Sequence, residues 1–465
     1  MCKMVFMSKK QNDFGSGSIP KVILSQSLPL MLAQLVHLLY NVIDRIYIGH
    51  LPEIGSLALT GVGLSFPITT LIMAFTSLFA YGGTPIFAIA RGQEDTKKAE
   101  HYLGQVCGML VYTSVVLFFV AWFWRKPILY LFGASDSSYF YANEYLRYYI
   151  FGITGSMLAT GLNGFINASG YPRYGMMTIF LGAVLNIVLD PLFIYGLNMG
   201  VRGAAIATVI SQTASALYAL YFFLKADAPY RLRRENMVPD FSCLRQMIPL
   251  GVTGFIMQGT SALVQILCNV MLRNYGGDLY VGVITIINSI REIFQLPASA
   301  ISSASQPVMS FNYGAGKPER IRQSIRFTTL IMGIYTAVAL AAVMLFPEFF
   351  IAIFTDDASL TAPGAAAIRI YFAGFFFMTF QLGGQAAFTS LKRAPQAIFF
   401  SLLRKVIIVV PLTLLLPGLG FGVNGVFLAE PISNIVGGLA CFLTMYFTIY
   451  KKLPAVAGSL NQTDR

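Results

Sequence analysis

Polar residues follow one face of the first long apolar segment of this chain. Gln34, His37, Asn41 and Asp44 are separated by three, four and three positions, which places them on one side of an α-helix. A charged side chain in a membrane-spanning segment costs on the order of 2.5 to 3.5 kcal/mol, so an acid retained there is a candidate for function. We expect this face to look inward, with Asp44 as its reactive group and Tyr40 one turn before it.

A second acid lies in a later apolar segment, around 174 to 195. Asn186 and Asp190 are four positions apart, and Pro191 prevents the normal helical bond back to the carbonyl of residue 187. Free carbonyl and carboxylate oxygens are the ligands that hard cations prefer. The spacing therefore predicts a cation site on this helix.

Asp44 and Asp190 are expected at the same depth. Each lies about five residues, roughly 7 Å at 1.5 Å per residue, before the same end of its helix. Two carboxylates in a poorly solvated pocket repel each other, so such a pair can exchange a proton for sodium or for substrate. A sodium ion could bind Asp44, Asn186 and Asp190. The alternative is that Asp44 pairs with Arg45 and that Asp190 caps a helix end.

The composition places these residues in a membrane. Hydrophobic residues make up 56% of the chain and charged residues 11%, and the mean hydropathy is +0.67. Apolar runs of the length that crosses a bilayer, about 20 residues, predict an all-α integral membrane protein with twelve transmembrane helices. These runs lie at roughly 22–48, 56–89, 101–124, 139–166, 174–195, 203–224, 246–272, 279–311, 327–354, 365–390, 396–417 and 423–449.

The twelve helices form two sets of six. The segment Gly196 to Ser211 (GLNMGVRGAAIATVIS) recurs 222 positions later as Gly418 to Ser433 (GLGFGVNGVFLAEPIS). This internal repeat predicts an N-terminal lobe over 21–225 and a C-terminal lobe over 246–450, joined by a polar linker at 226–245. Because six is even, both lobes enter the membrane from the same side, and a substrate cavity is expected at the repeat interface.

The basic residues predict the orientation. Most of the 32 lysines and arginines lie in alternate loops and in the tails, and only a few, such as Lys126 and Arg202, lie in the opposite set. We therefore expect the tails 1–20 and 451–465, and the linker, to be cytoplasmic.

The net charge of +12 does not indicate nucleic-acid binding, because the chain has no polar basic domain. Five scattered cysteines give neither a disulfide framework nor a metal motif.

Three segments resemble the MATE (multidrug and toxic compound extrusion) transporters, and most of all their MepA-like and DinF-like bacterial branches. They are LPLMLAQLVHLLYNVIDRIYIGHL, GFINASGYPRYGMMTIFLGAVLNIVLDPLFIYGL and SQPVMSFNYGAGKPERIRQ. The resemblance covers about 20–450. It implies a monomeric MOP-type antiporter of the bacterial inner membrane, in contact with lipid, that exports small amphipathic and often cationic compounds against H⁺ or Na⁺ by alternating access of the two lobes.

Carried over by position, the resemblance also implies a cation-coupling site in the N-terminal lobe. Its members would be Tyr40, Asp44, Asn163, Asn186, Asp190 and Thr208, with Thr160 a weaker candidate.

The C-terminal lobe departs from the family pattern, because the stretches GVTGFIMQGTSALVQ and YFAGFFFMTFQLGGQ contain no acid. Glu430 could pair with Arg404 or Lys405, or it could contact substrate. Weaker candidates for the substrate cavity are Gln34, His37, Asn41, Met257, Gln258, Gln381 and Glu430.

Other functions fit the sequence less well. An enzyme would need a cluster of ligands or acids, whereas His37, His50 and His101 are scattered, so we expect neither catalysis nor a cofactor beyond the coupling ion. The serious alternative is a lipid-linked oligosaccharide flippase of the same superfamily, in which cavity arginines would bind pyrophosphate. Arg291, Arg369, Arg404 and Lys405 lie only in the C-terminal lobe. The sequence does not distinguish H⁺ from Na⁺ coupling.

Overall fold

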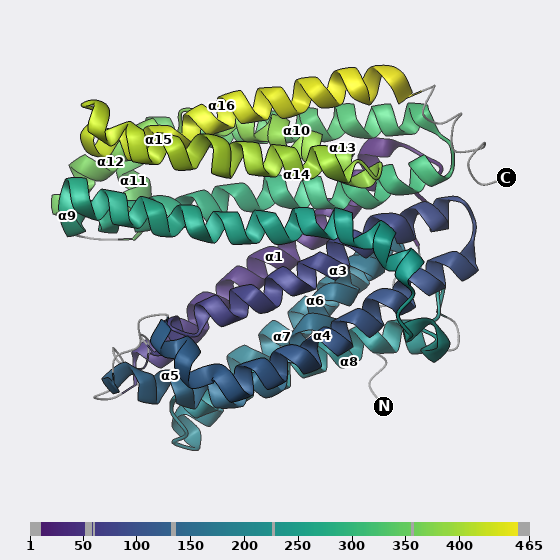
Figure 1. Ribbon diagram of the computed structural model, residues 1–465, viewed down its shortest axis with the longest axis horizontal. Coiled ribbons are helices and arrows are strands. Elements are labelled where there is room, and N and C mark those ends of the chain that lie inside the picture. Colours follow the sequence, from purple (N-terminus) through teal and green to yellow (C-terminus); the bar gives the residue numbers. More distant parts are fainter. Residues whose placement is uncertain are drawn as a thin grey trace. The chain divides into compact units, whose positions relative to one another are not determined.

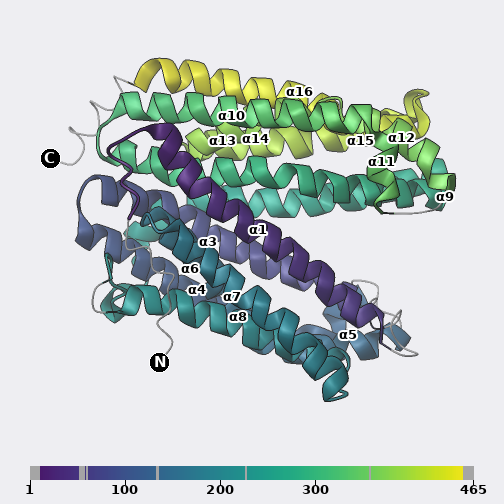
Figure 2. The same ribbon diagram turned by 180° about the vertical axis from the view of Figure 1, so that it is seen from behind.

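Helices account for almost all of the described chain. The computed structural model describes residues 11–51, 58, 61–131, 136–225, 228–354 and 358–453. Within these residues, twelve helices are long and apolar enough to cross a membrane. The predicted all-α membrane fold is therefore confirmed. The helices belong to two compact units, and the long rods within each unit can be followed in Figures 1 and 2.

The first unit contains residues up to Asp13 and the segment Leu28–Phe255. Within it α6 packs against α3, α4 and α8, and α7 packs against α8, as both views show. Its elements are most of α1 (Ile19–Gly49), α3 (Phe66–Gly92), α4 (Thr96–Leu131), α5 (Asp136–Tyr149), η1 (Ile150–Gly152), α6 (Ile153–Ala168), α7 (Pro172–Pro191), the π-helical η2 (Leu192–Gly196), α8 (Val201–Leu224), η3 (Arg234–Met237) and the start of α9 (Phe241–Gly314).

The second unit contains Phe14–Ser27 and the chain from Ile256 onward. Within it α16 packs against α12, α13, α15 and η5. Its elements are the rest of α9, α10 (Pro318–Leu345), α11 (Pro347–Ala352), α12 (Ala358–Phe372), η4 (Phe375–Phe377), α13 (Met378–Ser390), α14 (Ala394–Leu402), the π-helical η5 (Leu403–Val409), α15 (Val410–Leu415), η6 (Pro417–Leu419), α16 (Gly422–Thr448) and η7 (Tyr450–Lys452).

Helix α9 contains two of the membrane spans. Gly277 lies inside it with φ of 71° and ψ of −170°, a conformation that only glycine adopts without strain. The helical segments on either side, Phe241–Gly277 and Leu279–Gly314, are each long enough to cross a membrane. They match the seventh and eighth apolar runs of the sequence.

The internal repeat is visible in the backbone. Gly200 and Gly422 are 222 positions apart and have φ of +54° and +51° respectively, and each lies at the start of a long helix, α8 and α16. A Cβ on Gly203 would lie 2.7 Å from the backbone carbon of Phe193, and one on Gly425 would lie 2.7 Å from the nitrogen of Pro417. The repeated glycines thus permit the same turn and the same close approach in both units.

The polar linker is packed against the first unit. The Gln105 side chain on α4 donates to the carbonyl oxygens of Asn236 and Val238, and its oxygen accepts from the backbone nitrogen of Asp240 at 2.8 Å. Glu100, one turn earlier on α4, accepts from Arg233 at 2.8 Å. These contacts give the described linker residues a defined path along α4. Residues 226 and 227 lie outside the described residues.

A short N-terminal segment belongs to the second unit. Phe14 is fully buried and its ring lies edge-on to Phe311 at 5.8 Å. The Arg320 guanidinium donates to the carbonyl oxygens of Phe14, Ser16 and Gly17, at 2.9 to 3.3 Å. Arg320 comes from the NYGAGKPER motif, so this motif holds the start of the chain. Two stretches of the predicted lobes belong to the other unit: residues 21–27 to the second unit and residues 246–255 to the first. The predicted cytoplasmic tails fall largely on 1–10 and 454–465, outside the described residues.

Candidate functional sites

Helix α1 presents its polar stripe inward. Its large apolar side chains, such as Leu28, Leu39 and Ile46, are about half exposed on the opposite face, where lipid would cover them. Gln34, His37, Asn41 and Asp44 are half-buried. The predicted direction of the stripe is therefore confirmed.

Contacts along the stripe link its members. The Asn41 side-chain amide lies 3.1 Å from Nδ1 of His37, and the Tyr40 hydroxyl lies 3.4 Å from Nε2. The Gln212 amide of α8 reaches the Tyr40 hydroxyl at 3.5 Å. The His37 ring is therefore fixed by two neighbours on its own helix.

Asp190 is fully buried near the end of α7. Asn186, one turn earlier, donates its amide to Oδ1 of Asp190 at 3.1 Å and lies 3.4 Å from the Thr208 hydroxyl of α8. Pro191 follows, and the chain continues as the π-helical η2. π-Helical turns recur at functional sites because they change the direction of side chains and free backbone groups.

The structure brings Asp44 and Asp190 together. Each carboxyl group acts electrostatically on the other, so the two lie close together, as the shared depth predicted. Within the described residues, Oδ1 of Asp44, Oδ2 of Asp190 and Oδ1 of Asn186 have no hydrogen-bond donor. Neither carboxylate can donate to the other when both are ionised. Three buried oxygens without donors, two of them from carboxyl groups, fit a shared proton or an oxygen-coordinated cation such as Na⁺.

The alternative roles of the two acids find less support. The positive charge of Arg45 does act on Asp44, but the Arg45 side chain is exposed, whereas Asp44 is half-buried and close to Asp190. Asp190 accepts from the side chain of Asn186 inside α7 and is followed by further helical residues. It therefore does not cap a helix end.

Two tyrosines that the sequence reasoning missed complete this site. Tyr145 and Tyr149 on α5 are largely buried, and their rings stack at 5.6 Å. The Tyr145 hydroxyl lies near Thr208, and the charge of Asp44 acts on it. The signal was available as two tyrosines one helical turn apart, but α5 reads as a polar segment whose pattern does not show which face is buried.

Asn163 lies elsewhere. Its amide donates to the carbonyl oxygen of Gly175 and to the Thr178 hydroxyl, both at 2.6 Å. Thr178 is twelve residues before Asp190 on α7, about 18 Å along the helix. The repeat explains this placement, because Gln385, 222 positions after Asn163, donates in the same way to Ala397 O and Ser401 Oγ at 2.9 Å.

Asn163 and Gln385 therefore tie together the two arms of equivalent helical hairpins, and the structure does not place Asn163 with the acids. Thr160, the other α6 candidate, is exposed, and no hydrogen bond joins it to the acids within the described residues. Of the seven residues expected in the cation site, Tyr40, Asp44, Asn186, Asp190 and Thr208 come together.

The second unit holds a basic cluster around Glu430. The Glu430 carboxylate on α16 accepts from Arg404 at 3.1 Å and from Lys405 at 3.1 and 3.2 Å. Both cations lie in η5, and all three side chains are about nine-tenths buried. The two pairing partners left open by the sequence are therefore both present. This double pairing already satisfies the charge of Glu430 and disfavours a role for it in binding a cation.

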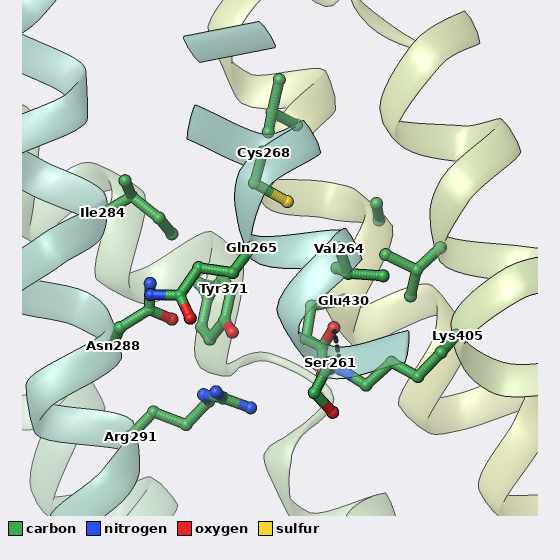
Figure 3. Close-up of a pocket in the computed structure, with 13 residues that line it drawn as sticks. Ser261, Val264, Gln265, Cys268, Ile284, Asn288, Arg291, Tyr371, Lys405 and Glu430 are labelled. Carbon is green, nitrogen blue, oxygen red and sulfur yellow. Dashed lines mark hydrogen bonds and ion pairs between the residues drawn. The ribbon is translucent and has the colours of Figure 1, made fainter. Parts of the chain in front are cut away.

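A cavity of about 40 Å³ adjoins this cluster. Figure 3 shows Gln265, Asn288 and Arg291 extending toward the space beside Tyr371, with the Lys405–Glu430 ion pair across from them. Of the residues expected to line a substrate cavity, only Glu430 lines this one. Met257 and Gln258 are exposed, and Gln381 is buried in the packing of α13 against α16.

Comparison with known proteins identifies the family. The sequence profile of the MatE family matches residues 29–192 and 254–415, more than half of the chain. The chain belongs to the MatE family. Among its relatives, the multidrug export protein MepA of Staphylococcus haemolyticus (strain JCSC1435) is 23% identical over 465 residues, which are 97% of this chain and 98% of that protein. The resemblance inferred from the sequence is confirmed.

Solved structures agree with this fold. A crystal structure of MATE in the bent conformation has a TM-score of 0.89 at 23% identity and covers 95% of this chain and 98% of that one. An outward-facing multidrug resistance MATE family transporter of the MOP superfamily has a TM-score of 0.86 at 24% identity and covers 96% and 98%. This MatE-family chain is thus a multi-pass membrane protein, and its family and structural neighbours are transporters.

Proposed function

We propose that this protein is a cation-coupled antiporter that exports amphipathic, often cationic compounds from a bacterial cell. The proposal rests on the MatE family match and on the relatives named multidrug export protein MepA. It places the chain in the inner membrane with both termini cytoplasmic, acting as a monomer by alternating access.

The observation that carries the coupling part of the proposal is the Asp44–Asp190 pair. Two carboxyl groups from different helices share one buried level with a neighbouring amide, and three of their oxygens lack donors. Such a site holds a proton or a cation in one state and releases it when the pocket opens to water. The proton or Na⁺ would be exchanged for substrate, with Tyr40, Asn186 and Thr208 positioning the acids.

Transport in proteoliposomes tests this function. Purified protein is reconstituted, ethidium is supplied, and a pH gradient or a Na⁺ gradient is imposed in separate runs. We expect ethidium movement driven by at least one of the two gradients, and none in protein-free vesicles. If neither gradient moves ethidium, although the reconstituted protein is folded, the proposal fails.

A lipid-linked oligosaccharide flippase is the second candidate, because the second unit gathers Arg291, Arg404 and Lys405. Assays in cells distinguish an exporter from a flippase. Expression of an exporter lowers susceptibility to amphipathic drugs, whereas a flippase restores growth of a flippase-deficient strain.

A further inference from the structure

The cavity of the second unit has more positive than negative charge around it. Arg404 and Lys405 share the single carboxylate of Glu430. Arg291 also lines the cavity. Within the described residues Arg291 has no ion-pair or hydrogen-bond partner, and its Nε is buried without one. Two cations that line the cavity, Arg291 and Lys405, and the neighbouring Arg404 therefore surround one acid.

Among the described residues that line the cavity, Glu430 is the only acid. Glu292, which follows Arg291 on α9, is exposed and does not line the cavity. The other polar lining residues are neutral and can donate hydrogen bonds: Ser261, Gln265, Asn288 and Tyr371. An uncompensated guanidinium inside a protein is unfavourable unless water or an anion satisfies it. These groups form the donor set of an anion site.

The size of the cavity limits what the site accepts. A single water needs about 10–15 Å³ of cavity volume. A cavity of 40 Å³ therefore holds about three water-sized atoms. That is the size of a carboxylate or of the oxygens on one face of a phosphate. An arginine binds either group through paired N–H donors.

We propose that this cavity binds the carboxylate or phosphate group of a small amphipathic molecule, with Arg291 as the residue that holds it and Asn288 and Gln265 as flanking donors. This site is separate from the proposed coupling site, which lies in the first unit. The repeat gives the two sites opposite charge: Glu430 is the counterpart of Thr208, 222 positions apart, yet Thr208 lies beside two acids and Glu430 beside two cations. An anion site in the second unit therefore extends the expected substrates beyond cations.

Binding to the full-length protein in detergent tests the proposal without any transport step, so its outcome is independent of the gradient experiment. The probe is 4-fluorobenzoate, followed by the ¹⁹F relaxation of the free ligand, with 4-fluorobenzamide and 4-fluorobenzylammonium as neutral and cationic analogues. We expect saturable binding of the benzoate alone. Equal responses from all three compounds would overturn the proposal.

Variants locate the site. Arg291→Gln should weaken benzoate binding at least tenfold, and Arg291→Lys should restore part of it. The matched control is Arg369→Gln, which removes an exposed arginine of the same unit that pairs with Glu348 at 3.5 Å and should leave binding unchanged. Glu430→Gln removes the only acid among the described lining residues and, at a temperature where the variant remains folded, should tighten binding severalfold, so the proposal stays testable if Arg291→Gln fails to fold. Unchanged binding in both Arg291→Gln and Glu430→Gln refutes it.

A competition arm identifies the natural source of the anion. Displacement of the benzoate by phosphatidylglycerol but not by phosphatidylcholine assigns the site to an anionic lipid headgroup. Benzoate binding that survives phosphatidylglycerol assigns it to a free amphipathic anion. Both results support an anion site, whereas the absence of any benzoate binding contradicts it.

Discussion

Lys405 Nζ lies 3.1 Å from Oε1 of Glu430 and 3.2 Å from Oε2, in contact with both carboxylate oxygens. Arg404, the preceding residue, reaches the same carboxylate. Adjacent residues of a regular α-helix point about 100° apart, and here they lie in the π-helical η5, which widens the turn. The local helix type thus allows two neighbouring cations to share one acid.

Glu430→Gln should lower the stability of the protein. It leaves Arg404 and Lys405 buried without their counter-ion, and removing one partner of a buried ion pair costs about 3–5 kcal/mol. Thermal unfolding in detergent measures the effect. Glu348→Gln is the matched control, because the Glu348–Arg369 pair is about half exposed and such surface pairs contribute roughly 0–1 kcal/mol. Equal melting temperatures of the two variants would show that the Glu430 cluster is not structural.

Arg320→Ala should release the N-terminal segment at Phe14 to Gly17. The arginine donates to three carbonyl oxygens of this segment and to Asn312, and the loss of such charge-assisted bonds costs about 1–3 kcal/mol at a partly exposed site. Hydrogen exchange of residues 14–18, read by mass spectrometry, should become faster. Arg326→Ala, an exposed arginine on the same helix, should leave it unchanged. Unaltered exchange in both variants would mean that burial of Phe14 alone holds the segment.

Val238→Cys tests the orientation of the linker. Val238 is 65% exposed, and the distribution of basic residues predicts that it faces the cytoplasm. An impermeant thiol reagent should label it only after the cells are permeabilised, above the background of the native cysteines. Lys126→Cys, in the opposite set of loops, should label in intact cells. Reversal of this pattern would invert the proposed topology.

Features set by helical periodicity could be predicted from the sequence. Asp44 and Asp190 were paired by counting residues to the ends of two nearly regular helices, and the count succeeded because rise per residue is constant. The same arithmetic places Asn163 at another depth, whereas the family resemblance groups it with the acids. The structure follows the arithmetic, since Asn163 bonds Thr178.

Other features depend on tertiary packing, which local pattern does not encode. The attachment of Phe14 to Arg320 joins residues about three hundred positions apart, and nothing in either segment specifies the other. The π-helical turn at Arg404 and Lys405 is likewise invisible in a run of apolar and basic residues. Tyr145 was missed because a half-polar α5 gives no sign of which face is buried.

The final prediction concerns where energy coupling resides. The first unit holds Asp44 and Asp190 close together, while Val264 and Thr413 occupy the approximately equivalent places of the second unit. Neither valine nor threonine can exchange a proton or carry a charge. We therefore expect the first unit alone to couple transport to the ion gradient.

Asp44→Asn and Asp190→Asn keep size and hydrogen bonding but remove the charge. Each should give folded, membrane-inserted protein that no longer drives gradient-dependent ethidium transport. If one proton enters per cycle, a gradient of about 100 mV supplies roughly 2.3 kcal/mol, enough for about fifty-fold accumulation, and the variants should show none. Glu430→Gln, assayed at a temperature where it remains folded, should keep coupled transport. If the Glu430 variant loses coupling while both aspartate variants still accumulate ethidium, the coupling site lies in the second unit instead.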